Sequence, residues 1–205
     1  MSKREPTGLI HGPLDEACVH LCIDMQAMFA DDTPWHTPWM SRMRPVLERL
    51  VKAHPDRTIF TRFIPVARAE DAQGAWQRYY KRWECMTLEK SDPAWIELLP
   101  ELQVHVPPAT VIDKGHYSPF MNPELQQILT ERGVTTLIIS GAETDVCVLA
   151  TVLDAIDRGY RVVVPVDAVC GSADETHDAL ITVYHSRFGQ QIETIRTDDL
   201  LQAWA

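Results

Sequence analysis

Hydrophobic and polar positions divide the chain into short apolar runs and longer segments with helical spacing. The apolar runs predict strands at residues 19–24, 57–64, 110–113, 134–140, 161–166 and 191–195. Apolar residues three or four positions apart predict helices at residues 41–53, 74–83, 122–132, 145–158 and 175–187. Ser41 is the expected N-cap of the first of these helices.

Strands that alternate with helices over short connections indicate a parallel sheet covered by helices on both faces. The expected fold is therefore a three-layer α/β/α arrangement of the Rossmann-like kind, with a central, mostly parallel sheet. We find no internal repeat or interdomain linker, so residues 1–205 are expected to form a single domain. Residues 66–106 are the least regular part, a long excursion of the kind that often has a functional role.

Composition narrows the classes of function. The 205 residues carry a formal net charge of −10, which disfavours a nucleic-acid-binding role, because phosphate contacts draw on clustered Lys and Arg. We see no apolar run of membrane-spanning length and no signal-peptide pattern, so we expect a cytoplasmic protein that does not contact membranes. The five cysteines are irregularly spaced, which is typical of a reduced protein without a disulfide framework.

Three reactive side chains fall at the ends of predicted strands, where open parallel sheets bind their ligands. Asp24 ends the first strand, Lys114 follows the strand at 110–113, and Cys147 lies just beyond the strand at 134–140. The same edge of the sheet is therefore expected to gather a carboxylate, an ammonium and a thiol. Each also has a structural interpretation, as a turn residue, a solvated lysine or a packed cysteine.

The chemistry of such a site follows from the thiol. A helix N-terminus and the Lys114 ammonium are both expected to lower the pKa of Cys147 and so favour the nucleophilic thiolate. Asp24 can take the thiol proton and return it to a leaving group. Backbone N–H groups at the start of the helix, including that of Cys147, can hold a developing oxyanion.

Three motifs contain these residues. Residues 24–29 (DMQAMF) resemble the DxQxxF motif of the isochorismatase-like cysteine hydrolases, and residues 114–120 (KGHYSPF) resemble their KxxxSxF motif. Residues 141–148 (GAETDVCV) resemble their GxxTDxCV motif. The motifs occur in the order found in the family, and the resemblance extends over residues 19–195.

The resemblance implies a catalytic triad of Asp24, Lys114 and Cys147 within the isochorismatase-like fold, and no cofactor. It also implies a non-proline cis peptide between Ala142 and Glu143. Such a bond would aim the backbone N–H of Glu143, together with that of Cys147, at the substrate oxygen.

Two comparisons within the family narrow the expected activity. Nicotinamidases carry an Asp-x-His metal motif after the second strand, where this chain reads TRFIP at residues 61–65, so a metal-independent enzyme is expected. Isochorismatases of siderophore pathways commonly lack the cysteine that is present here as Cys147. We therefore expect hydrolysis of a small amide, carbamoyl or ureido compound through a thioester.

Aromatic residues and one arginine are the candidates for contact with a small-molecule substrate. The principal candidates are Phe29, Arg62, Trp83, Tyr117 and Phe120, and further wall candidates are Trp35, Trp39, Trp76, Tyr79 and Tyr80. Arg62 could hold a substrate carboxylate in a bidentate pair, or could instead form a salt bridge within the loops. The aromatic residues could equally belong to the core or to a subunit interface.

Alternatives to the amidohydrolase remain. One is an isochorismatase-type vinyl ether hydrolase in which Asp24 does the acid–base work, and another is a catalytically silent binding domain. Nucleotide binding is disfavoured because the chain has no glycine-rich phosphate loop. The resemblance further suggests a homo-oligomer, either a dimer or a tetramer.

Overall fold

A computed structural model describes residues 5–204, and a parallel sheet forms its centre. The strands are β1 (Cys18–Ile23), β2 (Thr58–Phe63), β3 (Thr110–Lys114), β4 (Thr136–Ala142), β5 (Arg161–Pro165), β6 (Val169–Cys170) and β7 (Ile192–Ile195). They lie in the order β3-β2-β1-β4-β5-β7, with β6 paired to β4, and every pairing among these seven strands is parallel.

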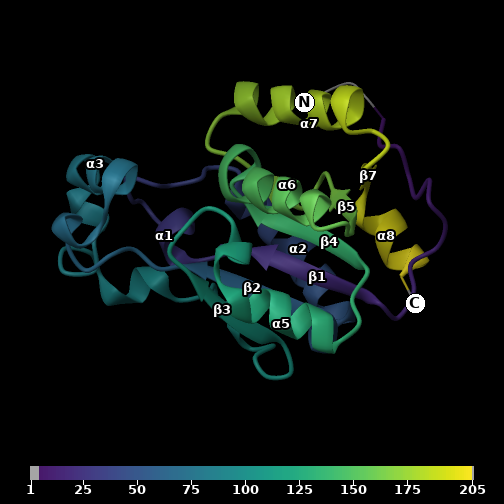
Figure 1. The fold of residues 1–205 in the computed structure, drawn as a ribbon, viewed down its shortest axis with the longest axis horizontal. Coiled ribbons are helices and arrows are strands. Elements are labelled where there is room, and N and C mark those ends of the chain that lie inside the picture. Colours follow the sequence, from purple (N-terminus) through teal and green to yellow (C-terminus); the bar gives the residue numbers. More distant parts are fainter. Residues whose placement is uncertain (1–4, 205) are drawn as a thin grey trace.

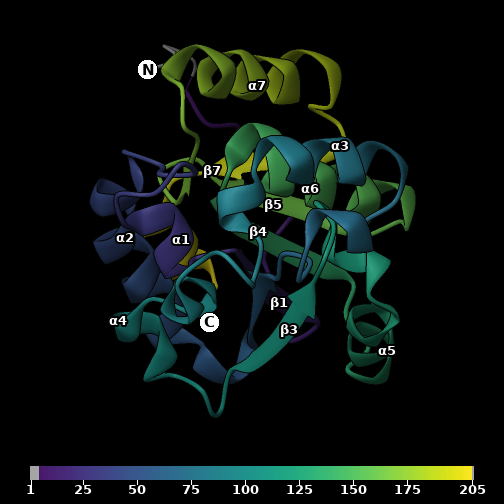
Figure 2. The ribbon, with the colours of Figure 1, turned by 90° about the vertical axis from the view of Figure 1, so that its left-hand side faces the viewer.

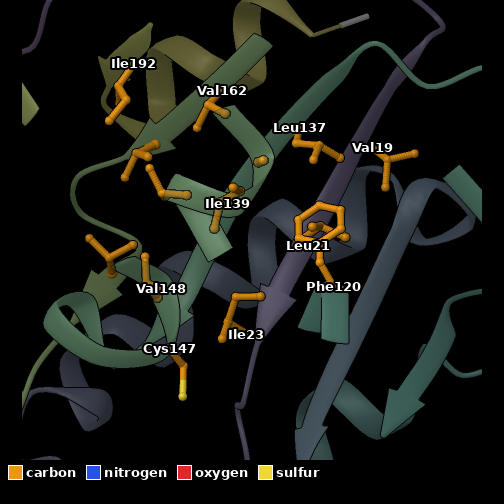
Figure 3. Packing of buried hydrophobic residues seen from close by; sticks show 14 of the residues in the cluster. Val19, Leu21, Ile23, Phe120, Leu137, Ile139, Cys147, Val148, Val162 and Ile192 are labelled. Atoms are coloured by element: carbon orange, nitrogen blue, oxygen red, sulfur yellow. The ribbon is translucent and has the colours of Figure 1, made fainter. Parts of the chain in front are cut away.

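Helices cover both faces of the sheet, which confirms the predicted three-layer fold (Figure 1). The apolar cluster on one face includes side chains from α5 (Pro123–Glu131), α6 (Leu149–Asp157) and α7 (Asp174–Arg187). Side chains from α2 (Met40–Ala53) and α8 (Thr197–Ala203) pack against the other face. Successive side chains of a strand point to opposite faces of the sheet, so one strand contributes to both layers. Leu21 and Ile23 belong to the first cluster (Figure 3), and Cys22 belongs to the second.

The irregular middle of the chain forms short helices around the carboxyl ends of the strands. It contains α3 (Gly74–Arg82) and α4 (Pro100–Gln103), while α1 (Ala27–Ala30) directly follows the first strand. Figure 2 looks onto this end of the molecule, with α1 and α3 in front of the sheet. Short 3-10 helices lie at Pro55–Arg57, Ala69–Asp71, Glu84–Met86, Pro93–Ile96 and Pro119–Met121.

None of the helices described between residues 5 and 204 has the length and apolar character needed to cross a membrane.

The structure differs from the sequence-based elements at several boundaries. Helix α2 begins at Met40, and Ser41 donates its hydroxyl proton to the oxygen of Pro38 instead of capping the helix. The helix predicted from residue 145 is divided into a π-helix, Thr144–Val148, and the α-helix α6. The final helix α8 was not predicted, because its seven residues (TDDLLQA) carry too few apolar positions to show a helical period.

Gly141 allows the two central strands to approach where the site is built. Its φ is +107°, and a Cβ at this position would lie 2.1 Å from the backbone oxygen of Ile23. Ile23 pairs with Gly141 in the β1–β4 register, one residue before Asp24. A side chain here would therefore separate the two strands that lead into Asp24 and Cys147.

Replacing Gly141 by Ala is expected to destabilise the fold by more than about 4 kcal/mol, because the clash is with backbone that cannot move aside. Gly133→Ala is the matched control, since Gly133 also has a positive φ of +62° but has nothing within 4 Å of its added Cβ. That control should lose only about 1–2 kcal/mol. Equilibrium urea unfolding measures both losses, and equal losses would show that backbone conformation alone sets the effect.

Candidate active site

Three strand ends bring Asp24, Lys114 and Cys147 together. Asp24 follows β1, Lys114 is the last residue of β3, and Cys147 lies in the turn that follows β4. The Nζ of Lys114 lies 2.7 Å from Asp24 Oδ2 and 3.4 Å from Cys147 Sγ. Since connections run outward in opposite directions from β1 and β4, this edge is the switch point at which open α/β sheets bind ligands.

The Asp24 carboxylate is fixed by its own backbone and by β2. Its φ is 51°, a left-handed conformation that Asp adopts more readily than most residues. The backbone N–H of Asp24 donates to the oxygen of Thr61 at 3.1 Å, and the Thr61 hydroxyl donates to Asp24 Oδ1 at 2.6 Å. One carboxylate oxygen is thus held by Thr61 and the other faces Lys114.

Lys114 is fully buried and has several contacts for its single charge. In addition to its contacts with Asp24 and Cys147, the ammonium donates to the backbone oxygen of His116 at 3.0 Å. It also lies 5.0 Å from the centre of the Phe63 ring. Burial opposes its charge, but the Asp24 carboxylate and the Cys147 sulfur together raise the pKa of Lys114 above its ordinary value. The ammonium therefore remains charged at neutral pH.

Gln26 and Ser118, from the first two motifs, support the site without lining its cavity. Gln26 is buried and exchanges two hydrogen bonds with the backbone of Phe63, at 2.7 and 3.0 Å, and donates to Ile96 at 2.8 Å. The hydroxyl of Ser118 donates to Asp154 at 2.5 Å, which ties the loop after Lys114 to α6. Sequence reasoning assigned no role to Gln26 or Thr61, although Gln26 is the glutamine of DxQxxF.

Cys147 lies in the short π-helix that joins β4 to α6. The peptide bond between Ala142 and Glu143 is cis, and Glu143 accepts backbone hydrogen bonds from Val146 and Val148 within the turn. Cys147 belongs with Val148 to the first apolar cluster, and Figure 3 shows its sulfur at the border of that cluster, pointing away from the other labelled side chains. The side chain is therefore placed for chemistry at the edge of the core.

The thiol is not acidified in the way the sequence suggested. Burial raises the pKa of Cys147, the Lys114 ammonium lowers it, and the Asp24 carboxylate, hydrogen-bonded to the same thiol, raises it again. The net shift is upward, so the expectation of a depressed pKa was wrong. A protonated thiol beside a carboxylate can pass its proton to that carboxylate.

A cavity of about 390 Å³ opens above the Cys147 sulfur. Phe29, Trp83 and Tyr117, three of the predicted substrate contacts, line it. Its other lining residues are Pro34, Trp35, His36, Phe63, Tyr79, Glu143, Val146, Cys147 and Ser172. Sequence reasoning missed Pro34, His36, Phe63, Val146 and Ser172, because only the fold brings these loops together.

Two predicted substrate contacts lie outside this cavity. Arg62 forms a bidentate pair with Asp113 at 2.8 and 3.0 Å and a third bond with Glu97 at 2.9 Å. Phe120 is buried in the core, where its ring stacks on Tyr160 with centroids 6.1 Å apart. Acidic neighbours occupy the Arg62 guanidinium, which is the salt-bridge alternative stated for it. The prediction failed for Phe120 because its ring points into the core (Figure 3).

The remaining aromatic candidates have supporting positions. Trp76 packs on Tyr117 with ring centroids 4.7 Å apart, and Tyr80 is buried beside Trp76. Trp39 lines a different cavity, between α2 and α7.

Among residues 5–204, no group of three or more His, Cys, Asp or Glu side chains is placed to hold a metal ion.

Comparison with known proteins identifies the family. Residues 18–196 match the isochorismatase domain model, and the chain belongs to the isochorismatase family. A cysteine hydrolase from Pseudomonas syringae pv. phaseolicola has the same fold, with a TM-score of 0.79 at 20% identity over 99% of this chain and 98% of that one.

Two curated relatives carry names that bear on activity. The ureidoacrylate amidohydrolase RutB of Methylobacterium radiotolerans is 35% identical over 97 residues, covering 47% of this chain and 38% of RutB. A probable inactive nicotinamidase of Arabidopsis thaliana is 30% identical over 168 residues, covering 78% of this chain and 84% of that protein. The chain spans about half the length, or less, of several curated relatives that it matches.

Proposed function

We propose that this chain is a cysteine-dependent, metal-independent amidohydrolase that cleaves a small amide, carbamoyl or ureido compound. The observation that carries the proposal is the position of the Lys114 ammonium between the Asp24 carboxylate and the Cys147 sulfur, under an aromatic cavity. Relatives named nicotinamidase, ureidoacrylate amidohydrolase and maleamate amidohydrolase support an amide as the bond that is cleaved. The enzyme is further proposed to be a cytoplasmic homo-oligomer.

Acylation begins when the Cys147 thiol transfers its proton to Asp24 and its sulfur attacks the substrate carbonyl carbon. Lys114 stabilises the sulfur while it carries negative charge, and the backbone N–H groups of Glu143 and Cys147 hold the carbonyl oxygen as it becomes an oxyanion. The tetrahedral adduct collapses as its C–N bond breaks. Asp24 returns the proton to the departing nitrogen, which leaves a thioester on Cys147.

Deacylation repeats these steps with water. Asp24 takes a proton from the water molecule as its oxygen attacks the thioester carbon, and the C–S bond then breaks. The sulfur recovers a proton from Asp24, and the acid product leaves. Each cycle therefore consumes one water molecule, releases an amine or ammonia with an acid, and restores the free thiol.

Mass spectrometry of the protein quenched in acid during turnover tests this mechanism. Small carboxamides and ureido acids should add the mass of their acyl group, and peptide mapping should place it on Cys147. Cys85→Ser is the matched control because Cys85 is the exposed free cysteine of the described chain. Loss of the adduct in Cys147→Ala together with full hydrolysis would instead support a vinyl-ether-type mechanism without an acyl-enzyme.

A further inference from the structure

The cavity above Cys147 has an aromatic wall built around one indole ring. Trp35 stacks on Phe29 with ring centroids 6.2 Å apart and an interplanar angle of 14°, and it contacts Tyr79 at 5.8 Å. Trp83 meets the same indole edge-on at 6.4 Å, with an interplanar angle of 71°. These contacts fix the orientations of the rings on the wall, and aromatic faces carry negative electrostatic potential.

The charged groups of the wall add to this potential. Glu143 is the carboxylate on the wall, where it accepts hydrogen bonds from the hydroxyls of Thr37, at 3.3 Å, and Ser172. Burial raises the pKa of Glu143 above its ordinary value, and these hydrogen bonds oppose the rise by stabilising the carboxylate. No Lys or Arg among the described residues lines the cavity. The Lys114 ammonium at its base is already paired with Asp24. His36 is exposed at the edge, with its Nδ1 2.8 Å from the backbone oxygen of Asp31.

Among the described residues, no lysine or arginine of the cavity wall is available for the carboxylate recognition that the sequence suggested for Arg62. Arg62, the candidate for that role, is held by Asp113 and Glu97 outside the cavity. An anionic substrate would bring its charge beside Glu143 and the aromatic faces, where like charges repel.

We propose that the part of the substrate distant from the cleaved bond is a positively charged amine or quaternary ammonium group, held by the aromatic faces and by Glu143. A cation gains from the ring quadrupoles when it lies over Trp or Tyr faces, and gains more when a carboxylate is close. The cavity volume of about 390 Å³ suits such a group attached to a short amide. The inference depends on the proposed function in one respect, namely that the occupant of the cavity is a substrate.

Three amides of the same length test the preference. They are a butanamide with a terminal trimethylammonium group, the same chain ending in tert-butyl, and the same chain ending in carboxylate, with nicotinamide as a flat neutral comparison. We expect kcat/KM for the cation to exceed that of the tert-butyl compound about tenfold and that of the carboxylate about a hundredfold. A preference for the carboxylate, for the tert-butyl compound or for nicotinamide would overturn the inference.

Two variants test whether residues of the cavity cause the preference for a cationic substrate. Glu143→Gln and Trp83→Leu should each lower the ratio of kcat/KM between the cation and the tert-butyl compound severalfold, and the ratio is insensitive to a general loss of activity. Glu97→Gln is the matched control, since it removes the same charge from a carboxylate that lies outside the cavity on Arg62. An unchanged ratio in the first two variants, or an equal fall in Glu97→Gln, would contradict the assignment.

A binding measurement separates this inference from the proposed function. Calorimetry compares choline with its neutral isostere, in which carbon replaces the quaternary nitrogen, on the wild-type protein and on Cys147→Ser. Choline bound about tenfold more tightly by both proteins, with no hydrolysis of any amide, would support the cation site and contradict the proposed function. An acyl-enzyme formed without discrimination between the two probes would support the function and overturn the inference.

Discussion

Asp24→Asn is expected to lower kcat/KM about a thousandfold while making Cys147 easier to alkylate. The two effects have opposite signs because the carboxylate has two roles. It accepts the thiol proton during attack, so its loss removes the base. It also raises the pKa of the resting thiol, so its loss leaves the Lys114 ammonium to stabilise the thiolate. Alkylation of Cys147 by iodoacetamide should therefore reach its plateau at a lower pH in the variant than in the wild type.

Peptide-resolved mass spectrometry is needed to follow this reaction, because the chain has five cysteines and Cys85 is exposed. Asp113→Asn is the matched control, since it makes the same chemical change one residue before Lys114 but on the exposed side chain that pairs with Arg62. Its kcat/KM and its alkylation profile should remain those of the wild type. An Asp24→Asn enzyme that stays active would show that Asp24 is not the base, and a thiol that becomes less reactive would show that Asp24 does not raise the pKa of the resting thiol.

The comparison of sequence and structure is clearest for the strand ends. Apolar runs and the helices between them determined the α/β class, and parallel strands that end at one edge were enough to expect Asp24, Lys114 and Cys147 together. Each of these residues ends or follows a strand, so its position depends on local pattern alone. The distances between them follow from the strand order, which the motifs specify only through the resemblance.

Properties that depend on neighbours in three dimensions were harder to predict from the sequence. The thiol pKa was predicted in the wrong direction because the sequence shows a nearby helix start and a lysine, but does not show how completely Cys147 is buried or that Asp24 reaches it. For a similar reason, the sequence could not decide between a substrate contact and a salt bridge for Arg62. Its partner Asp113 lies on the neighbouring strand at a position that only the β2–β3 register brings opposite it.

The cavity wall was partly predictable from residue type. Aromatic residues of the middle segment were candidates, and Tyr79 and Trp83 do line the cavity, whereas Tyr80 points into the core. Adjacent residues on a helix point to different sides. Helix α3 is too short for its apolar pattern to show which side lines the cavity. Glu143 was considered only for its backbone, so its carboxylate on the wall was missed.

Lys114→Met is expected to destabilise the protein by about 3–5 kcal/mol and to abolish most of the hydrolytic activity. The side chains of Lys114 and Asp24 are both fully buried, with 0% exposure, and lie 2.7 Å apart. Methionine fills much of the lysine volume, so the lost stability comes from the missing charge more than from an empty cavity. What remains is a buried carboxylate whose cation is gone, and the hydroxyl of Thr61 cannot neutralise it.

The double variant Asp24→Asn, Lys114→Met separates charge from packing. Removing both charges leaves no unpaired ion in the core, so the double variant should recover more than half of the stability that Lys114→Met loses, although it stays inactive. Lys52→Met is the matched control, because Lys52 is exposed on α2 and its loss should change the unfolding free energy by less than about 0.5 kcal/mol. Urea unfolding of the four proteins and the wild type, including Asp24→Asn alone, gives the coupling energy. Additive losses would mean that the two charges do not interact, and the close ion pair on which the proposed proton transfer depends would then be absent in solution.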